Sequence, residues 1–304
     1  MKDQVFSVGY RRLPGQRPRR WAPWPIARTA LALAWRRRST KLGVALCMGS
    51  VFICGIALTF QVLIDRFASS PRESELQRAV LRGIVGSVHS TFASYISAQM
   101  LTCTFLLAMV AAGLIAEDRR TGAMELYFSR PLRRRDYVLG KLLAAGLVPL
   151  TMLVAPFLLL WIFVVGMAPP HTAGAMLGLL LPGLLGAVVA SVVLTTTILG
   201  LSAIGERGST VGVIYVVGMV VLASLGNGLS DQGQRWAGYL SPLRNIQTLA
   251  DAVLDAGGTG LLLSMLTDRP ETNPSALVAT ACLLVLAAAG LFLLLWRVRR
   301  EVAG

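Results

Sequence analysis

The chain alternates long apolar windows that carry no charge with short charged segments. Four of these windows are each long enough for one helix to cross a hydrocarbon core of ~30 Å, which takes ~20 residues. A fifth, Leu142–Gly205, is too long for one crossing, and Pro169-Pro170-His171 divides it. The pattern predicts six spans at about 42–64, 93–116, 142–167, 173–203, 208–230 and 272–296.

These spans must be helical, because a segment that crosses lipid has to satisfy its backbone polar groups internally. Composition agrees, with 55% hydrophobic residues, 14% charged residues and a mean hydropathy of +0.64. We therefore predict an all-α integral membrane protein with six transmembrane helices. Residues 25–304 form the transmembrane domain, and residues 1–24 are a basic extension.

Lys and Arg fix the expected orientation, since they are enriched in cytoplasmic segments. With the N-terminus inside, 22 of the 29 basic residues are cytoplasmic. We expect a multi-pass protein of a bacterial-type plasma (inner) membrane with both termini in the cytoplasm. The net charge of +14 is then a topology signal and a contact for anionic membrane lipids. No basic folded domain supports a nucleic-acid partner.

Short helices are expected outside the spans. Pro25–Arg38 has the apolar, basic and Trp residues of an N-terminal interfacial helix. On the external side, Ser70-Pro71-Arg72-Glu73 is a capping-box start for a helix that runs to Val88. Ser241-Pro242 starts another helix that ends before Gly257, and Leu261–Leu266 is a further apolar piece. These last two are too short to cross and read as interfacial or re-entrant helices before the last span.

The spans lack the groups that membrane enzymes and ion-coupled carriers use. No predicted span contains Asp, Glu, Lys or Arg, and His89 and His171 lie in or beside external loops. Catalysis and proton or sodium coupling are therefore disfavoured. Gly140-Lys141 is not a phosphate loop, because position 135 is Arg and position 142 is Leu. We expect Lys141 to snorkel at the cytoplasmic head of the third span.

The most informative segment is a charged island at residues 116–141, which holds eleven charged residues between two uncharged flanks. It reads Asp118-Arg119-Arg120-Thr121-Gly122-Ala123-Met124-Glu125-Leu126, followed by Pro131, Arg134 and Gly140-Lys141. This run, with the basic N-terminal helix and six spans, resembles ABC-2 type transporter permeases. Asp118 replaces the more common Glu, Ala123 replaces Thr or Ser, and Arg133 stands where Ser often precedes the Arg.

The resemblance implies that Asp118–Leu126 forms a cytoplasmic coupling helix, which docks into a groove of a separate ABC ATPase subunit. Two such subunits would bind ATP and Mg²⁺, so no cofactor is expected in this chain, which is not an enzyme by itself. A second permease subunit, identical or related, would complete the transporter. The implied ATPase-coupling residues are Asp118, Arg119, Gly122, Met124, Glu125, Leu126, Tyr127, Phe128, Pro131 and Arg134.

The sequence predicts a permease that exports hydrophobic or amphipathic cargo, because the path would be lined by apolar residues, Gly and Thr. In one alternative, the ATPase works on an external protein partner without moving cargo, or the chain is a membrane scaffold. In another, Cys47 and Cys54, seven residues apart on one helix face, bind a soft metal such as Cu(I). Small apolar packing residues are the simpler interpretation of these cysteines, and no metal site is expected.

Overall fold

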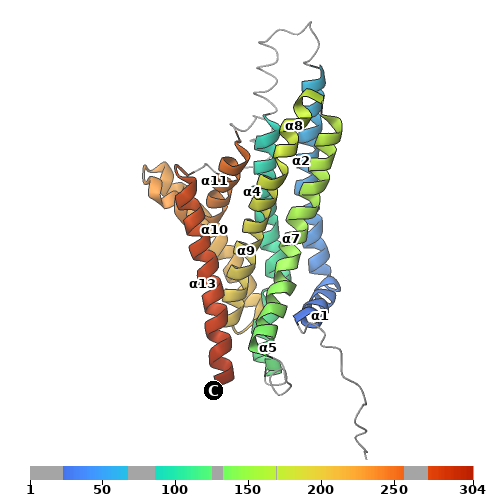
Figure 1. The fold of residues 1–304 in the computed structure, drawn as a ribbon. Coiled ribbons are helices and arrows are strands. Elements are labelled where there is room, and N and C mark those ends of the chain that lie inside the picture. The colour runs from blue at the N-terminus through green and yellow to red at the C-terminus, as the bar shows by residue number, and fades with distance from the viewer. Residues whose placement is uncertain (1–22, 68–85, 125–132, 169, 257–272, 304) are drawn as a thin grey trace, which may run out of the picture.

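The computed structural model describes residues 23–67, 86–124, 133–168, 170–256 and 273–303. Within these ranges the chain is helical and contains no strand. Six helical segments are long and apolar enough to cross a membrane, so the predicted fold class and number of spans are confirmed. Figure 1 shows them as an elongated bundle, with the C-terminus and α1 at the same end.

The helices extend further than the uncharged windows do, because charged residues continue them into the aqueous phase. The first is α1 (Pro23–Trp35), which packs on the cytoplasmic half of α7. The spans are α2 (Arg38–Phe67), α4 (Val88–Val110) continued by α5 (Gly113–Arg120), α7 (Arg134–Met167), α8 (Pro170–Gly178) continued by α9 (Leu180–Ile204), α10 (Gly208–Asp231) and α13 (Ala276–Ala303).

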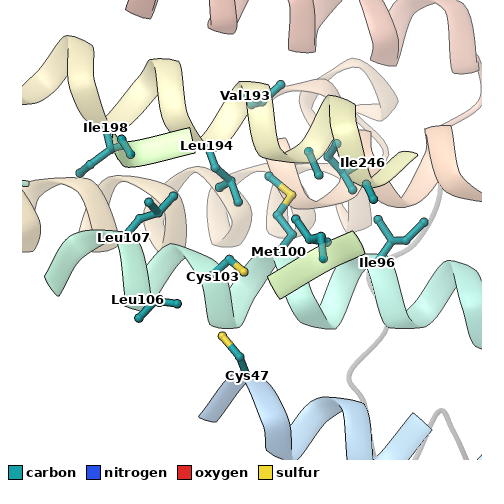
Figure 2. Close-up of a cluster of buried hydrophobic side chains, with 14 of the residues drawn as sticks. Cys47, Ile96, Met100, Cys103, Leu106, Leu107, Val193, Leu194, Ile198 and Ile246 are labelled. Carbon is teal, nitrogen blue, oxygen red and sulfur yellow. The ribbon is translucent and has the colours of Figure 1, made fainter. Parts of the chain in front are cut away.

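The centre of the bundle is α4, which contacts α2, α7, α9, α10 and the short helix α11 (Pro242–Leu254). It is also the most buried span. Figure 2 shows Met100 and Leu107 on the side of α4 that faces α9, which carries Leu194 and Ile198, with Ile246 of α11 beside Met100. Because lipid is as apolar as these side chains, their close packing and not a hydrophobic effect between helices holds the bundle together.

Glycines allow the closest helix crossing, between α9 and α13. A Cβ at Gly200 would lie 2.6 Å from the carbonyl oxygen of Gly290, and one at Gly290 would meet the carbonyl of Thr196. Neither position can hold a side chain without separating the two backbones. Small residues at such crossings let transmembrane helices gain contact area, and here they join the last span to the rest.

Polar groups deep in the spans serve the bundle itself. Pro156 has no N–H, so the carbonyl of Met152 loses its helical partner, and Gln99 of α4 donates its Nε2 proton to that oxygen at 2.9 Å. Tyr95 donates its hydroxyl to the next carbonyl, that of Leu153, at 2.8 Å. Ser50 of α2 donates to the Gln99 amide oxygen. One amide side chain thus ties α2 and α7 to α4.

The external end is closed by α11 and the 3₁₀ helix η1 (Arg235–Leu240). Ser241 caps α11 and Pro242 opens it, as the sequence predicted. Much of α11 is buried, and it packs on α4, α9 and α13. The Ser70–Val88 helix lies outside the described residues except at its end, where α4 begins at Val88. Leu261–Leu266 also lies outside them.

We predict that Gly290→Ala destabilises the protein by about 1–3 kcal/mol, since the added methyl forces α9 and α13 apart. Gly49→Ala is the matched control, because a Cβ there meets no atom within 4 Å and alanine favours the helix. The measurement is thermal unfolding in detergent, reported by thiol labelling of the buried Cys47, Cys54 and Cys103. Equal midpoints for both variants would contradict the assigned crossing.

Candidate functional site: a charged junction of four helices

The second span breaks near its C-terminal end, at Ala111 and Ala112, between α4 and α5. The break exposes backbone groups that lipid cannot satisfy. Ser202 of α9 satisfies three of them: its hydroxyl donates to the carbonyl of Ala112 at 2.7 Å and accepts from the amides of Ile115 and Ala116 at 3.2 Å. The break is therefore stabilised by specific hydrogen bonds, and these fix the direction in which α5 leaves the bundle.

At the end of α5, three consecutive charged residues each contact a different helix. Glu117 accepts a hydrogen bond from the first residue of α10, and Asp118 pairs with Lys141 near the start of α7. Arg119 donates to a carbonyl at the end of α9. Successive residues point about 100° apart around a helix, so a triplet faces three directions. We call this arrangement, with Ser202, the junction.

The central contact is the ion pair between Asp118 and Lys141. The two side chains are 2.7 Å apart, measured from Oδ2 to Nζ. The phenol of Tyr137 donates to the same carboxylate oxygen at 2.8 Å, and Lys141 lies 5.5 Å from the centre of the Tyr137 ring. Lys141 is only 4% exposed. The prediction that Lys141 snorkels to water is wrong, because its charge is neutralised inside the protein.

Arg119 caps the end of α9. Its Nη1 lies 2.8 Å from the carbonyl of Ala203 and 3.2 Å from those of Ile204 and Gly205, to which it donates. These carbonyls have no partner within the helix, and a cation there also stabilises the negative end of the helix dipole.

Glu117 makes the complementary contact at the start of α10. Its Oε1 accepts from the amide of Gly208 at 3.4 Å, and its other oxygen pairs with Arg120 at 2.8 Å. A carboxylate at a helix N-terminus is favourable for the same electrostatic reason that places Arg119 at the end of α9. Gly208 and Gly113 bring the backbones together, since a Cβ at Gly208 would lie 2.6 Å from the Cα of Gly113.

Gly140 and Lys141 have separate structural roles. A Cβ at Gly140 would lie 2.9 Å from the Cβ of Ile26 and 3.1 Å from the carbonyl oxygen of Pro23. Gly140 therefore lets α1 rest on α7, while the next residue holds Asp118. Gly140 and Lys141 are adjacent in the sequence motif. Through them, the same turn of α7 contacts both α1 and the junction.

The chain turns directly after the junction. Gly122 has a φ of +68°, a left-handed conformation that favours glycine, which confirms the expected tight turn. The helix predicted over Asp118–Leu126 is therefore interrupted, since α5 ends at Arg120. Met124 is buried, and Arg134 is exposed at the first turn of α7. Glu125, Leu126, Tyr127, Phe128 and Pro131 lie outside the described residues.

The structure brings Asp118 and Arg119 together with residues that sequence reasoning had not assigned to the site. Ser202 and Tyr137 carried no signal, because a single Ser in an apolar span and a Tyr at its head are common. Glu117 stood next to the motif but outside its pattern. Contact of Asp118 and Arg119 with a partner remains a prediction, whereas their contacts within the chain are observed.

The cysteines give a different picture from the one that the soft-metal alternative assumed. Cys47 and Cys54 are buried on α2, and Figure 2 shows the sulfur of Cys47 facing that of Cys103 on α4. Among the described residues, no group of three or more His, Cys, Asp or Glu side chains could hold a metal ion.

These features define a multi-pass helical membrane protein in which one short segment, α5, holds charged contacts to three spans at one end of the bundle. Residues 36–297 match the family described as "ABC-2 family transporter protein". Since the match covers most of the chain, the protein belongs to the ABC-2 family of ABC transporter permeases. Comparison with curated proteins gives no significant match.

We predict that Asp118→Asn destabilises the protein by about 3 kcal/mol, because it leaves the Lys141 charge buried without a counter-charge. Adding Lys141→Met should recover much of this loss. Glu117→Gln is the control and should change little, since its ion-pair partner Arg120 has a side chain that is 57% exposed. Thermal unfolding of the purified chain measures all three. An Asp118→Asn variant as stable as Glu117→Gln would rule out a structural role for the pair.

Proposed function

We propose that this chain is the membrane-spanning subunit of an ATP-driven exporter, and that the junction is where work from a separate ATPase subunit enters it. The observation that carries this proposal is the triplet Glu117–Arg119, with its contacts to α10, α7 and α9. The segment that follows it, from Thr121 to Arg133, would lie on the ATPase.

The junction suits this task because it links one short segment to three spans. A displacement of α5 would act directly on the Asp118–Lys141 ion pair, on the cap that Arg119 forms and on the close contact of Gly113 with Gly208. Packed helices respond to such a load by moving as rigid bodies between discrete arrangements. Closure of two ATPase subunits around ATP would therefore move α7, α9 and α10 together relative to the rest of the bundle.

Within this proposal, Asp118 and Arg119 transmit the movement, while Glu125, Leu126, Tyr127 and Phe128 provide the docking surface. Met124, which the sequence assigned to that surface, is buried within the chain. Gly122 forms the turn between the junction and the docking surface. Pro131 and Arg134 lead back into α7. The second permease subunit, the two ATPase subunits with ATP and Mg²⁺, and the surrounding lipids complete the assembly. Both termini and the junction lie on the cytoplasmic side of a bacterial-type inner membrane, as the distribution of Lys and Arg indicates.

Hydrophobic or amphipathic cargo is supported by the grooves on the bundle. One of about 430 Å³ lies between α7 and α9, with walls from Leu143, Leu147, Val188 and Leu291. Its Thr195 hydroxyl donates to the carbonyl of Ser191 at 2.7 Å, which leaves the methyl group for the groove. Another of about 620 Å³ lies between η1, α10 and α13. Surfaces of this kind favour apolar ligands over hydrated ions.

A second function is work on an external protein without transport, and the buried external helix α11 is the feature that favours it. It packs on α4 and α9, so movement of these spans would reach the external surface. The two functions differ in what stimulates ATP hydrolysis by the complex. Stimulation by apolar cargo supports export, whereas stimulation by an external protein alone supports mechanotransmission.

We predict that Glu125→Arg detaches or uncouples the ATPase while the chain still inserts into the membrane. A reversed charge in a docking surface meets like charge on the partner. Glu301→Arg, at the cytoplasmic end of α13, is the control for charge reversal outside the island. Copurification of the ATPase subunit and ATP hydrolysis by the complex are the measurements. Normal values for both in Glu125→Arg would defeat the proposal.

A further inference from the structure

The groove between α7 and α9, which run side by side (Figure 1), is hollow because small residues meet where the two helices pack. A Cβ at Gly146 of α7 would lie 3.5 Å from the methyl carbon of Thr195 on α9. Leucines of α7 and valines of α9 form the walls around a volume of about 430 Å³. At the rim, Leu139 is 44% exposed and Val192 is 50% exposed. The groove therefore opens sideways, toward the surrounding bilayer.

Every hydroxyl in the lining of the groove donates its proton to a carbonyl of its own helix. Ser191 donates to the carbonyl of Ala187 at 2.8 Å, and Thr196 donates to that of Val192 at 2.8 Å. Thr195 is bonded in the same way. The walls consequently present apolar atoms to a ligand. At this depth in a membrane the apolar material at hand is the acyl chain of a lipid, and an unfilled hollow would lose dispersion contacts along its walls.

The length of the groove matches the depth of one leaflet. On α7 the lining extends from Leu139 to Leu150, a length of ~17 Å at the rise of 1.5 Å per residue. Half of a hydrocarbon core of ~30 Å is ~15 Å. An acyl chain that lies along the groove would thus reach from the headgroup boundary to about the middle of the bilayer.

Positive charge lies at the end of the groove nearest the start of α7. Arg135, Leu139, Gly146 and Leu150 follow one another at steps of four, seven and four residues, so they share one face of the helix. Arg135 is exposed and extends this face beyond the apolar lining. Asp136 adjoins it in the first turn, but the two preceding arginines leave this turn with a net positive charge.

The last span brings a second arginine to the same end. Leu291 of α13 lines the groove, and Leu295 and Arg299 follow at steps of four residues, both exposed. The glycine crossing of α9 and α13 puts Leu291 at about the level of Gly146. From this level, Arg299 lies ~12 Å and Arg135 ~17 Å toward the same end of the bundle. Long arginine side chains can span this small difference in height and meet one headgroup.

We propose that the groove holds an acyl chain of one anionic phospholipid, whose phosphate binds Arg135 and Arg299. Basic sites between transmembrane helices bind such headgroups, and a guanidinium group pairs with a phosphate through two parallel hydrogen bonds. The lipid fills the hollow between α7 and α9, and its headgroup links α13 to α7. This inference goes beyond the proposed function, because the site needs neither an ATPase nor a second permease subunit.

Photolabelling of the full chain in phosphatidylcholine vesicles tests the site. The probe is a trace of phosphatidylglycerol that carries a diazirine on one acyl chain. Illumination should label the peptides of α7 and α9 that contain Gly146 and Val192, as identified by mass spectrometry. Unlabelled phosphatidylglycerol should displace the probe about tenfold better than added phosphatidylcholine does, because the arginines favour a net negative headgroup. Inorganic phosphate should not displace it, since it has no acyl chain for the groove.

Removal of charge tests the headgroup contact. Arg135→Gln combined with Arg299→Gln should reduce labelling of the groove about tenfold, and both side chains are exposed, so the fold should be kept. Arg36→Gln combined with Arg38→Gln is the matched control. It removes the same charge from exposed positions between α1 and α2 and should leave the labelling unchanged. Equal labelling of the two double variants would overturn the role of the arginines and with it the proposal.

A bulky side chain tests the acyl-chain contact. Val192→Trp should fill the groove and abolish its labelling, whereas Ile56→Trp on α2 should not, although the parent side chains are 50% and 43% exposed. An unfolding midpoint close to that of the parent chain shows that each variant is folded. Labelling spread evenly over the exposed faces of all six spans would overturn the proposal. So would displacement of the probe by phosphatidylcholine as effective as that by phosphatidylglycerol.

Discussion

The constraint on which the whole structure depends is that lipid offers no hydrogen-bond partner to a backbone group. A helix in this environment may break only where a side chain replaces the missing partner. Three interruptions in the described spans have such a replacement. Ser202 fills the break between α4 and α5, and Gln99 bonds the carbonyl that Pro156 releases in α7. Arg119 does the same for the last carbonyls of α9.

These replacements also decide how the helices are connected. A side chain that satisfies a backbone group on a neighbouring span joins two spans at a fixed height. Neutral groups perform this task in the membrane interior, where an unpaired charge has a high free-energy cost. Charged groups perform it at the end of the bundle that carries the junction, where Asp118 and Lys141 neutralise each other. The junction thus connects the spans at the end where the proposed ATPase would act.

The fold was largely readable from the sequence, because an uncharged window of twenty residues has few alternatives to a transmembrane helix. The breaks between helices were harder to predict. Pro169 and Pro170 indicated one of them, but nothing in the run Val110–Gly113 predicts that the second span stops and restarts there. That break depends on Ser202, about ninety residues away in the chain. A contact of this kind depends on the packing of α5 against α9, which local patterns do not encode.

The candidate site, like the fold, could be predicted from the sequence only in part. The motif from Asp118 to Leu126 begins at two residues of the junction, and Gly122 has the backbone conformation that its position implied. The partners of Asp118 and Arg119 could not be deduced, since a cytoplasmic charge is usually solvated. Exposure was therefore the reasonable expectation for Lys141, and it failed because Tyr137 and Asp118 together replace water around the ammonium group.

The junction also explains how a load on α5 would reach α10. Glu117 bonds the amide of Gly208, the first residue of α10, and a Cβ at Gly208 would lie 2.6 Å from the Cα of Gly113. Because the two backbones are already this close, a displacement of α5 would push α10 at its first residue. The other two contacts of the triplet act on α7 and α9. An ATPase that moved α5 would therefore displace three spans together, and the rest of the bundle would have to repack around them.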